Sequence, residues 1–202
     1  RDVRLLVVDP VTTFWTKGSF GTSEPARKAF ARLQRELLER GVDFYIADPA
    51  LLAEGTTETA GGKAVFALRN DRFEAVLLPF MKNIEPCAIE PLAVFAKAGG
   101  NLLAVESLPE EDIGFGKPEA FSSLFGGDLP RCRLLPAEKA AEEMETLLPP
   151  AWVVKDLDGK TPEGLLRLSG VSEELGACLF LVNTTGQKQE LTLSYEGKTE
   201  RI

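Results

Sequence analysis

Histidine is absent from the 202 residues of this sequence, and no other feature of the composition excludes as much chemistry. Without an imidazole there is no Ser-His-acid triad, no Cys-His dyad and no base that titrates near neutral pH. The three cysteines, Cys87, Cys132 and Cys178, are widely spaced and include no Cys-x-x-Cys pair. We therefore predict no metal site, and we interpret the cysteines as buried thiols.

Other absences narrow the possible ligands and partners. No apolar run approaches the roughly 20 residues that a membrane span needs. The glycine pairs at 61–62, 99–100 and 126–127 lack the spacing of a phosphate-binding loop, so no nucleotide cofactor is expected. With 31 acidic and 23 basic residues, the net charge of −8 repels phosphate backbones and anionic lipid. We expect neither nucleic acid nor membrane as a partner.

Apolar runs alternate with helical segments through the first two thirds of the chain. This alternation predicts an α/β fold with a parallel sheet, a flavodoxin-like three-layer domain. The expected strands are 3–8, 42–47, 73–80, 102–105 and 132–135, with a further short strand at 63–68. The expected helices are 26–40, 86–98, 118–125 and 137–148, and the glycine- and threonine-rich segment 11–25 is expected to be a loop, with Ser23 as N-cap of the helix that follows.

The pattern changes after Pro149-Pro150. Short segments at 164–170, 177–183 and 189–196 are separated by turn residues, and the last alternates apolar with polar side chains, as strands of an antiparallel sheet do. We predict two domains, an α/β domain at 1–150 and the truncated start of a β-sandwich at 151–202. The chain begins with Arg1 and ends within a predicted strand, so we expect it to be a piece of a larger protein; nothing in it indicates a compartment.

Glu106 and Ser107 follow the strand 102–105, at the sheet edge where α/β proteins place ligands and nucleophiles. A nucleophile elbow would present such a residue beside backbone donors. Here Leu108 and Pro109 follow without the usual glycines, and no histidine exists to activate Ser107. We expect no catalytic residue at this position, and a capping or loop-anchoring role instead.

The segment DPVTTFW at residues 9–15 is the second candidate. Asp9, Thr12, Thr13 and Trp15, together with Glu106, could bind a sugar through hydroxyl contacts and indole stacking. The alternative, which we favour, is that Phe14 and Trp15 fold back to cover the end of the sheet. The acidic runs at 110–112, 142–145 and 173–174 are interpreted as solvated faces, because glycoside chemistry needs two carboxyl groups that face each other across a cleft.

Three stretches carry a resemblance to a known family: RLLVVDPVTTFW, ERGVDFYIADPALL and FEAVLLPFMKNIEPCAIEPLAVFAKAGGNLLAVESLP. They resemble the class I glutamine-amidotransferase-like α/β domain beside the catalytic barrel of large bacterial glycoside hydrolases. Similar domains occur in β-galactosidases of the trimerising kind and in the rhamnosidases of glycoside hydrolase family 106. The tail, GLLRLSG followed by CLFLVNTTGQKQELTLSYEGKTERI, resembles the entry to the β-sandwich of those rhamnosidase-like enzymes.

The resemblance also implies what is missing. True amidotransferases have a GxCxG elbow after the strand that follows the glycine pair, with a distant His-x-Glu. Laid on that pattern, LLAVES puts Glu106 at the position of the cysteine, and the histidine is absent. Cys87 lies on the preceding predicted helix and cannot substitute for it. The resemblance therefore transfers no catalytic residue to this chain.

Three functions follow as hypotheses. The first is an accessory, non-catalytic domain of a bacterial glycoside hydrolase, which packs against a catalytic barrel outside this chain; the parent protein would be the enzyme and this piece inactive. The second is a carbohydrate-binding module that uses residues 9–15. The third is an oligomerisation module that pairs with further copies of itself.

Overall fold

The computed structural model describes residues 3–15, 23–109, 111–112 and 119–202 of the chain. Among these residues, no helix is long and apolar enough to cross a membrane. They form two compact units. The α/β unit comprises Val3–Ala31 and Phe44–Ala140, and the β unit comprises Arg32–Asp43 and Ala141–Ile202. Helix α2 (Ser23–Glu39) begins in the first unit and ends in the second, and the predicted domains 1–150 and 151–202 remain a prediction.

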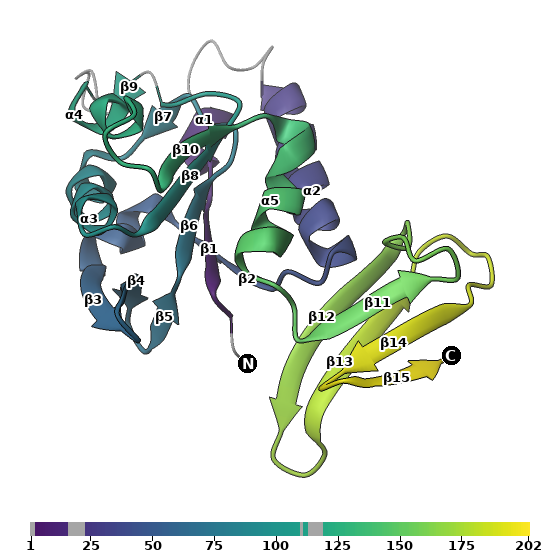
Figure 1. The fold of residues 1–202 in the computed structure, drawn as a ribbon. Helices are drawn as coiled ribbons and strands as arrows, with labels where there is room; N and C mark the ends of the chain where they lie inside the picture. The colour runs from purple at the N-terminus through teal and green to yellow at the C-terminus, as the bar shows by residue number, and fades with distance from the viewer. Residues whose placement is uncertain (1–2, 16–22, 110, 113–118) are drawn as a thin grey trace. The chain divides into compact units, whose positions relative to one another are not determined.

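A five-stranded parallel sheet is the centre of the α/β unit (Figure 1). Its strands are β1 (Leu5–Val8), β2 (Phe44–Ala47), β6 (Ala75–Leu78), β8 (Asn101–Val105) and β10 (Cys132–Leu135). The order across the sheet is β10-β8-β6-β1-β2, the 2-1-3-4-5 order of a doubly wound sheet of the flavodoxin type. The expected α/β fold class is confirmed.

The three central strands, β1, β6 and β8, are buried on both faces, which explains why they read as continuous apolar runs. Leu6, Val76 and Leu102 belong to the main hydrophobic core. Leu5 and Leu77 point to the opposite face and are fully buried as well. The sheet is therefore the middle of three layers.

Helix α3 and a small antiparallel sheet lie on the side of the main core (Figure 1). The remaining elements of the unit are α1 (Val11–Trp15), η2 (Pro49–Glu54), β3 (Thr56–Ala60), β4 (Lys63–Leu68), β5 (Asp71–Phe73), β7 (Asn83–Ile84), α3 (Pro86–Lys97), β9 (Glu111–Asp112), α4 (Glu119–Ser122) and η3 (Ser123–Phe125). Helix α5 (Ala137–Leu147) begins here and ends in the β unit. Phe66 of β4 and Phe95 of α3 meet edge to face, with ring centroids 5.7 Å apart.

The β unit contains a three-stranded antiparallel sheet and a long hairpin. The sheet has the order β11-β14-β15, and the hairpin pairs β12 with β13. Their bounds are β11 (Trp152–Asp156), β12 (Leu165–Ser172), β13 (Gly176–Asn183), β14 (Leu191–Tyr195) and β15 (Lys198–Arg201). Val154, Leu165 and Leu191 form a small core between the sheet and the hairpin. The antiparallel pairing of these strands confirms the prediction for this part of the chain.

Several expectations need correction. The segment 11–25 was expected to be a loop, yet Val11–Trp15 forms helix α1, because Thr13 is anchored from outside the segment; residues 16–22 of that predicted loop lie outside the described residues. The strands β3 and β11 were not expected, since each gains its structure from a partner strand that local pattern does not reveal. Strand β9 was not expected either, and residues 110 and 113–118 on its two sides lie outside the described residues.

Candidate functional site

The five residues predicted to bind a ligand come from two places on one edge of the sheet. Asp9 follows β1, and Thr12, Thr13 and Trp15 lie on α1 directly after it. Glu106 follows β8. Strands β1, β6 and β8 are parallel neighbours in the sheet. The residues that follow β1 and the residue that follows β8 therefore lie at the same edge, the carboxyl edge. The sheet therefore assigns all five residues to the edge that sequence reasoning indicated.

Asp9 is half-buried beside a second aspartate. Its backbone N–H donates to the Ala47 carbonyl at 2.8 Å, which continues the pairing of β1 with β2 by one residue. Val8 and Ala47 are register partners, so Asp48 follows β2 where Asp9 follows β1. Burial raises the pKa of the Asp9 carboxyl above its usual value, and the charge of Asp48 raises that pKa further.

Glu85, which precedes α3, is a third carboxyl group in this neighbourhood. Burial is the main cause that raises its pKa, and the charges of Asp48 and Asp9 add to the rise. Hydrogen bonds from the backbone of Glu85 and from the Thr12 side chain act in the opposite direction and lower that pKa. We name Asp9, Thr12, Asp48 and Glu85 the carboxyl-edge cluster. No group that could hold a metal ion is found among the described residues.

Sequence reasoning missed Asp48 and Glu85. A signal for Asp48 exists in the sequence: the first two strands both end in Asp-Pro, at Asp9-Pro10 and Asp48-Pro49, and neighbouring parallel strands bring such residues together. Glu85 has no comparable signal, because its proximity to Asp9 depends on the packing of α3.

Thr13 is buried, with only 2% of its surface exposed. Its hydroxyl oxygen accepts hydrogen bonds from the backbone N–H groups of Lys82 at 3.0 Å and Asn83 at 3.3 Å. The side chain thus joins α1 to the start of β7. In this structure Thr13 anchors the predicted binding segment, and a direct contact with a ligand remains a prediction.

The two aromatic side chains of α1 behave differently. Phe14 is half-buried: its ring lies 6.3 Å from that of Phe30, and the Arg27 guanidinium is 4.8 Å from its centroid. Trp15 is 72% exposed, so the expectation that it folds back over the end of the sheet is wrong. The helical turn directs the two neighbouring side chains to different sides, so Phe14 packs against Phe30 while Trp15 is exposed.

Glu106 occupies an unusual backbone conformation. Its φ angle is +63°, and Ser107 N–H donates to the Val105 carbonyl across it at 2.7 Å. A hydrogen bond from residue i+2 to residue i around a positive φ is a γ-turn of the rare, strained kind. The Glu106 N–H donates to the Leu135 carbonyl at 2.8 Å, which ties the turn to the end of β10. Its side chain is exposed.

The glycine pair before β8 ends helix α3 and has no binding geometry. Gly99 N–H donates to the Ala96 carbonyl at 3.0 Å and Gly100 N–H to the Phe95 carbonyl at 2.9 Å, the two bonds of a Schellman motif. Gly99 takes the left-handed conformation at φ +85°. A β-carbon at Gly100 would come within 2.3 Å of the Phe95 ring. The pair therefore allows the helix to close onto the strand.

The cysteines differ from one another. Cys132 is buried in the main core, and burial raises the pKa of its thiol. Cys87 is exposed on α3, and Cys178 is half-exposed on β13; all three are free thiols. The interpretation as buried thiols is correct for Cys132 and wrong for Cys87, because a helix has side chains on all sides and Cys87 lies on a side of α3 that the core does not cover.

Chemically, the carboxyl edge offers acceptors and exchangeable protons. Two half-buried carboxyl groups whose charges repel each other are an arrangement that general acid/base chemistry uses. Asp9 and Glu85 are therefore the residues to change when catalysis is tested. The hydroxyl of Thr12 and the exposed indole of Trp15 add a hydrogen-bonding group and a stacking surface to the same edge.

No protein-family model matches the sequence, and no curated relative matches it. Solved structures do share its fold. Gan42B, a GH42 beta-galactosidase, matches with a TM-score of 0.65 and 12% identity over 100% of this chain and 39% of that chain. A catalytic mutant of Gan42B from G. stearothermophilus matches with a TM-score of 0.66 and 13% identity, with the same two coverages. The apo exo-carrageenase GH42 from Bacteroides ovatus matches at 0.59 and 12% identity over 97% of this chain and 25% of that chain.

These matches establish a shared fold and no more, because the identities are low. This chain spans between a quarter and two fifths of the length of the chains it matches. The matched β-galactosidase chains agree with the β-galactosidase side of the resemblance seen in the sequence. The likeness to the rhamnosidases and to the amidotransferases remains a prediction.

Proposed function

We propose that this chain is an accessory, non-catalytic module of a bacterial glycoside hydrolase. The observation that carries the proposal is the coverage of the structural matches. The fold of almost the whole chain recurs in each of three glycoside hydrolase chains, and it accounts for at most 39% of any of them. A module of this size in a larger enzyme leaves room for a separate catalytic domain, for which we propose a barrel.

The chemistry of the chain supports a non-catalytic role. No histidine is available, and Glu106 stands at the turn where an amidotransferase-like elbow would hold its nucleophile. Its side chain is exposed to water, whereas the two carboxyl groups of a glycosidase flank the scissile bond inside a cleft. The module would support the barrel by packing against it or by shaping the entrance to its substrate cleft.

Activity measurements test this proposal. The chain should neither release nitrophenol from aryl β-galactosides or aryl α-rhamnosides nor hydrolyse glutamine above the buffer rate. Three variants serve as probes: Glu106→Gln, Asp9→Asn and Glu85→Gln. If any of these substitutions abolishes a measured turnover rate, the chain is itself an enzyme. A residual rate that all three leave unchanged would indicate a contaminating hydrolase.

A second candidate function is carbohydrate binding at residues 9–15, which the exposure of Trp15 favours. An indole that is 72% exposed, at the sheet edge that also holds half-buried carboxyl groups, has the composition of a sugar-stacking site. Calorimetric titration with rhamnose and galactose tests it. Heat that disappears in Trp15→Ala supports binding at this edge, whereas heat that persists in the variant excludes it.

A third candidate is self-association through the outer face of the β12–β13 hairpin. Leu168 and Phe180 are register partners there and are 36% and 62% exposed, and Val182 beside them is 56% exposed. Such a row of apolar side chains is typical of a surface that becomes covered. Sedimentation equilibrium decides this candidate: a concentration-dependent mass that Phe180→Ser returns to that of the monomer supports it.

A further inference from the structure

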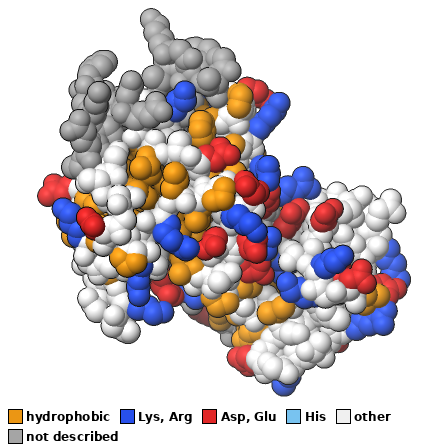
Figure 2. All heavy atoms as spheres, turned by 45° about the horizontal axis from the view of Figure 1, so that its top comes forward, with side chains coloured by type: hydrophobic (Ala, Val, Ile, Leu, Met, Phe, Trp, Pro, Cys, Tyr) orange, Lys and Arg blue, Asp and Glu red, His pale blue; other side chains and the backbone are white. Residues whose placement is uncertain are grey.

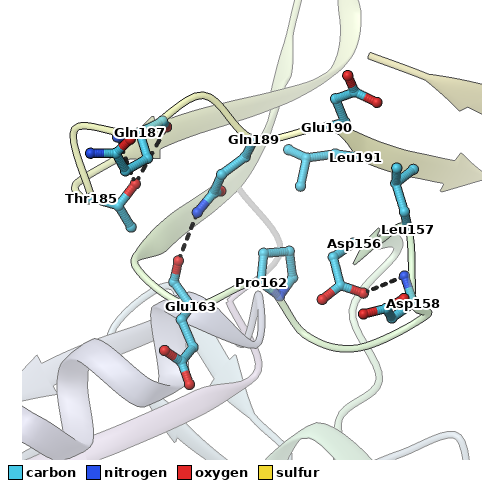
Figure 3. Close-up of a pocket in the computed structure, with 10 residues that line it drawn as sticks. All are labelled: Asp156, Leu157, Asp158, Pro162, Glu163, Thr185, Gln187, Gln189, Glu190 and Leu191. Atoms are coloured by element: carbon cyan, nitrogen blue, oxygen red, sulfur yellow. Dashed lines mark hydrogen bonds between the residues drawn. The ribbon is translucent and has the colours of Figure 1, made fainter.

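The β unit contains a pocket of about 550 Å³ that is separate from the carboxyl-edge cluster. Figure 3 shows its lining side chains, which come from the loop between β11 and β12 and from the segment that leads from β13 into β14. A volume of this size is within the range of small-molecule sites and is ample for one or two sugar rings. The pocket is thus large enough for a ligand and built by one unit of the chain.

Both loops are held in place by their own side chains. The Asp156 carboxylate accepts hydrogen bonds from the backbone N–H groups of Asp158 at 2.9 Å and Lys160 at 2.8 Å. On the opposite side, the Thr185 hydroxyl accepts from the Gln187 N–H at 3.1 Å. A ligand would therefore meet a preformed pocket and would lose little free energy to the ordering of loops.

Gln189 contributes a polar side chain to the lining of the pocket. Its side-chain Nε2 donates to the Glu163 carbonyl at 3.0 Å, a bond that fixes the orientation of the amide across the pocket (Figure 3). The amide oxygen Oε1 is buried and has no hydrogen-bond partner among the described residues. A buried acceptor without a donor is costly, so this atom favours a bound group that donates a hydrogen bond.

The charged groups of the lining point to the same kind of ligand. Asp156, Asp158, Glu163 and Glu190 line the pocket, and none of its lining residues is Lys or Arg. Glu190 is paired with Arg201, and Asp156 is occupied by the loop, which leaves Asp158 as the exposed carboxylate at the rim. Glu163 turns its backbone carbonyl to the pocket, and its carboxylate points away (Figure 3). These groups accept hydrogen bonds and repel anions.

Apolar groups line the pocket as well. Leu191 and Pro162 are buried at its base, and Leu157, which is 54% exposed, adds an apolar side wall. A fully charged ligand such as a polyamine would leave this surface unused. A sugar ring, which carries hydroxyl donors at its edge and C–H groups on its faces, matches both kinds of lining.

We infer that this pocket binds a neutral, hydroxyl-rich ligand of the size of a mono- or disaccharide. One ligand hydroxyl donates to Gln189 Oε1, others donate to the Asp158 carboxylate at the rim, and a C–H face of the ring packs on Leu191 and Pro162. The site does not depend on the proposed accessory role, and it lies in a different unit from Trp15.

A titration followed by ¹H–¹⁵N correlation spectra of the full chain tests the inference. The neutral probes are methyl β-galactoside, methyl β-glucoside and lactose; glucosamine is the cationic probe and galacturonate the anionic one. We expect at least one neutral probe to shift amide signals of 156–163 and 185–191 saturably, and galacturonate to shift none of them. Gln189→Leu should weaken that binding by about fivefold or more, as expected for the loss of a buried hydrogen bond.

Asp158→Asn and Glu173→Gln form the pair of charge variants. Asp158 lies at the pocket rim, whereas Glu173 is an exposed carboxylate in the turn between β12 and β13. The first variant should weaken binding and the second should leave it unchanged. The inference is overturned if no neutral probe gives saturable shifts, if glucosamine alone binds, or if both charge variants bind as the native chain does.

Discussion

The guanidinium of Arg167 donates a hydrogen bond to the backbone carbonyl of Glu39, the last residue of helix α2. A second bond runs from Arg167 to the Val154 carbonyl at 3.4 Å. The arginine is only 2% exposed, and burial lowers its pKa to about 10. Within the β unit, this side chain thus joins the end of a helix to two strands, and its positive charge complements the negative end of the helix dipole.

Arg167→Ala should lower the free energy of unfolding by about 2–4 kcal/mol, because it removes a buried charge-assisted donor and leaves backbone carbonyls without it. Urea unfolding followed by circular dichroism measures the change. The control is Arg72→Ala, which removes an exposed ion pair with Glu58 at 2.7 Å and should cost less than about 1 kcal/mol. Equal costs for the two variants would contradict the structural role of Arg167.

Asp9→Asn should stabilise the chain at pH 7. The folded-state pKa of Asp9 lies above the ordinary value of 3.8, so its ionised form opposes folding at neutral pH. As the pH falls through the folded-state pKa and then below 3.8, the carboxyl becomes protonated in both states and that penalty disappears. Unfolding curves from pH 7.5 to pH 3.5 should show a stability gain over the native chain that shrinks toward acid. A gain that is independent of pH would show that the charge of Asp9 is not its cause.

Thr13→Val should destabilise the α/β unit by about 1–3 kcal/mol, because two buried N–H groups, those of Lys82 and Asn83, lose their acceptor. Thr13→Ser retains the hydroxyl and should retain most of the stability. Thermal unfolding of the two variants makes the comparison at nearly constant side-chain size. If the valine variant is as stable as the native chain, the hydrogen bonds to the Thr13 hydroxyl do not stabilise the fold.

At position 106, glycine should give a more stable chain than alanine by about 1 kcal/mol, since a left-handed φ of +63° penalises any side chain. The matched control is Glu90, an exposed position inside α3, where alanine should exceed glycine by a similar amount. The measurement is the urea midpoint of the four variants. The same order at both positions would show that the turn at Glu106 stores no conformational strain.

The surface adds no obstacle to these experiments. On the face that Figure 2 shows, Lys and Arg side chains are interspersed with Asp and Glu. Exposed ion pairs of the chain include Lys28 with Glu24 at 3.3 Å and Arg69 with Glu54 at 3.4 Å. Exposed pairs of this kind contribute little to stability. Variants elsewhere can therefore be compared without large changes in surface electrostatics.

The local sequence pattern was sufficient to predict the main strands of the chain. The buried runs at 3–8, 73–80 and 102–105 predicted parallel strands because both faces of such strands are covered, and the run of leucines in β12 predicted a strand in the second unit. The two Asp-Pro junctions after β1 and β2 even contain the information that brings Asp9 next to Asp48.

The candidate sites depended on contacts between distant segments. Thr13 is anchored by residues about 70 positions away, and the orientation of Gln189 depends on a carbonyl 26 positions away. Arg167 is an example of the same kind. It is a charged residue within GLLRLSG, and it is buried because the end of α2 supplies an acceptor for its guanidinium.

The amino-acid sequence by itself determined the fold class, the parallel arrangement of the apolar strands and the absence of imidazole chemistry, because these depend on residue type and on short-range periodicity. Tertiary structure alone decided which polar side chains are buried, which carboxyl groups repel one another and where a pocket opens. Those properties depend on distances between segments that are far apart in the chain, and burial and charge act through distance in space.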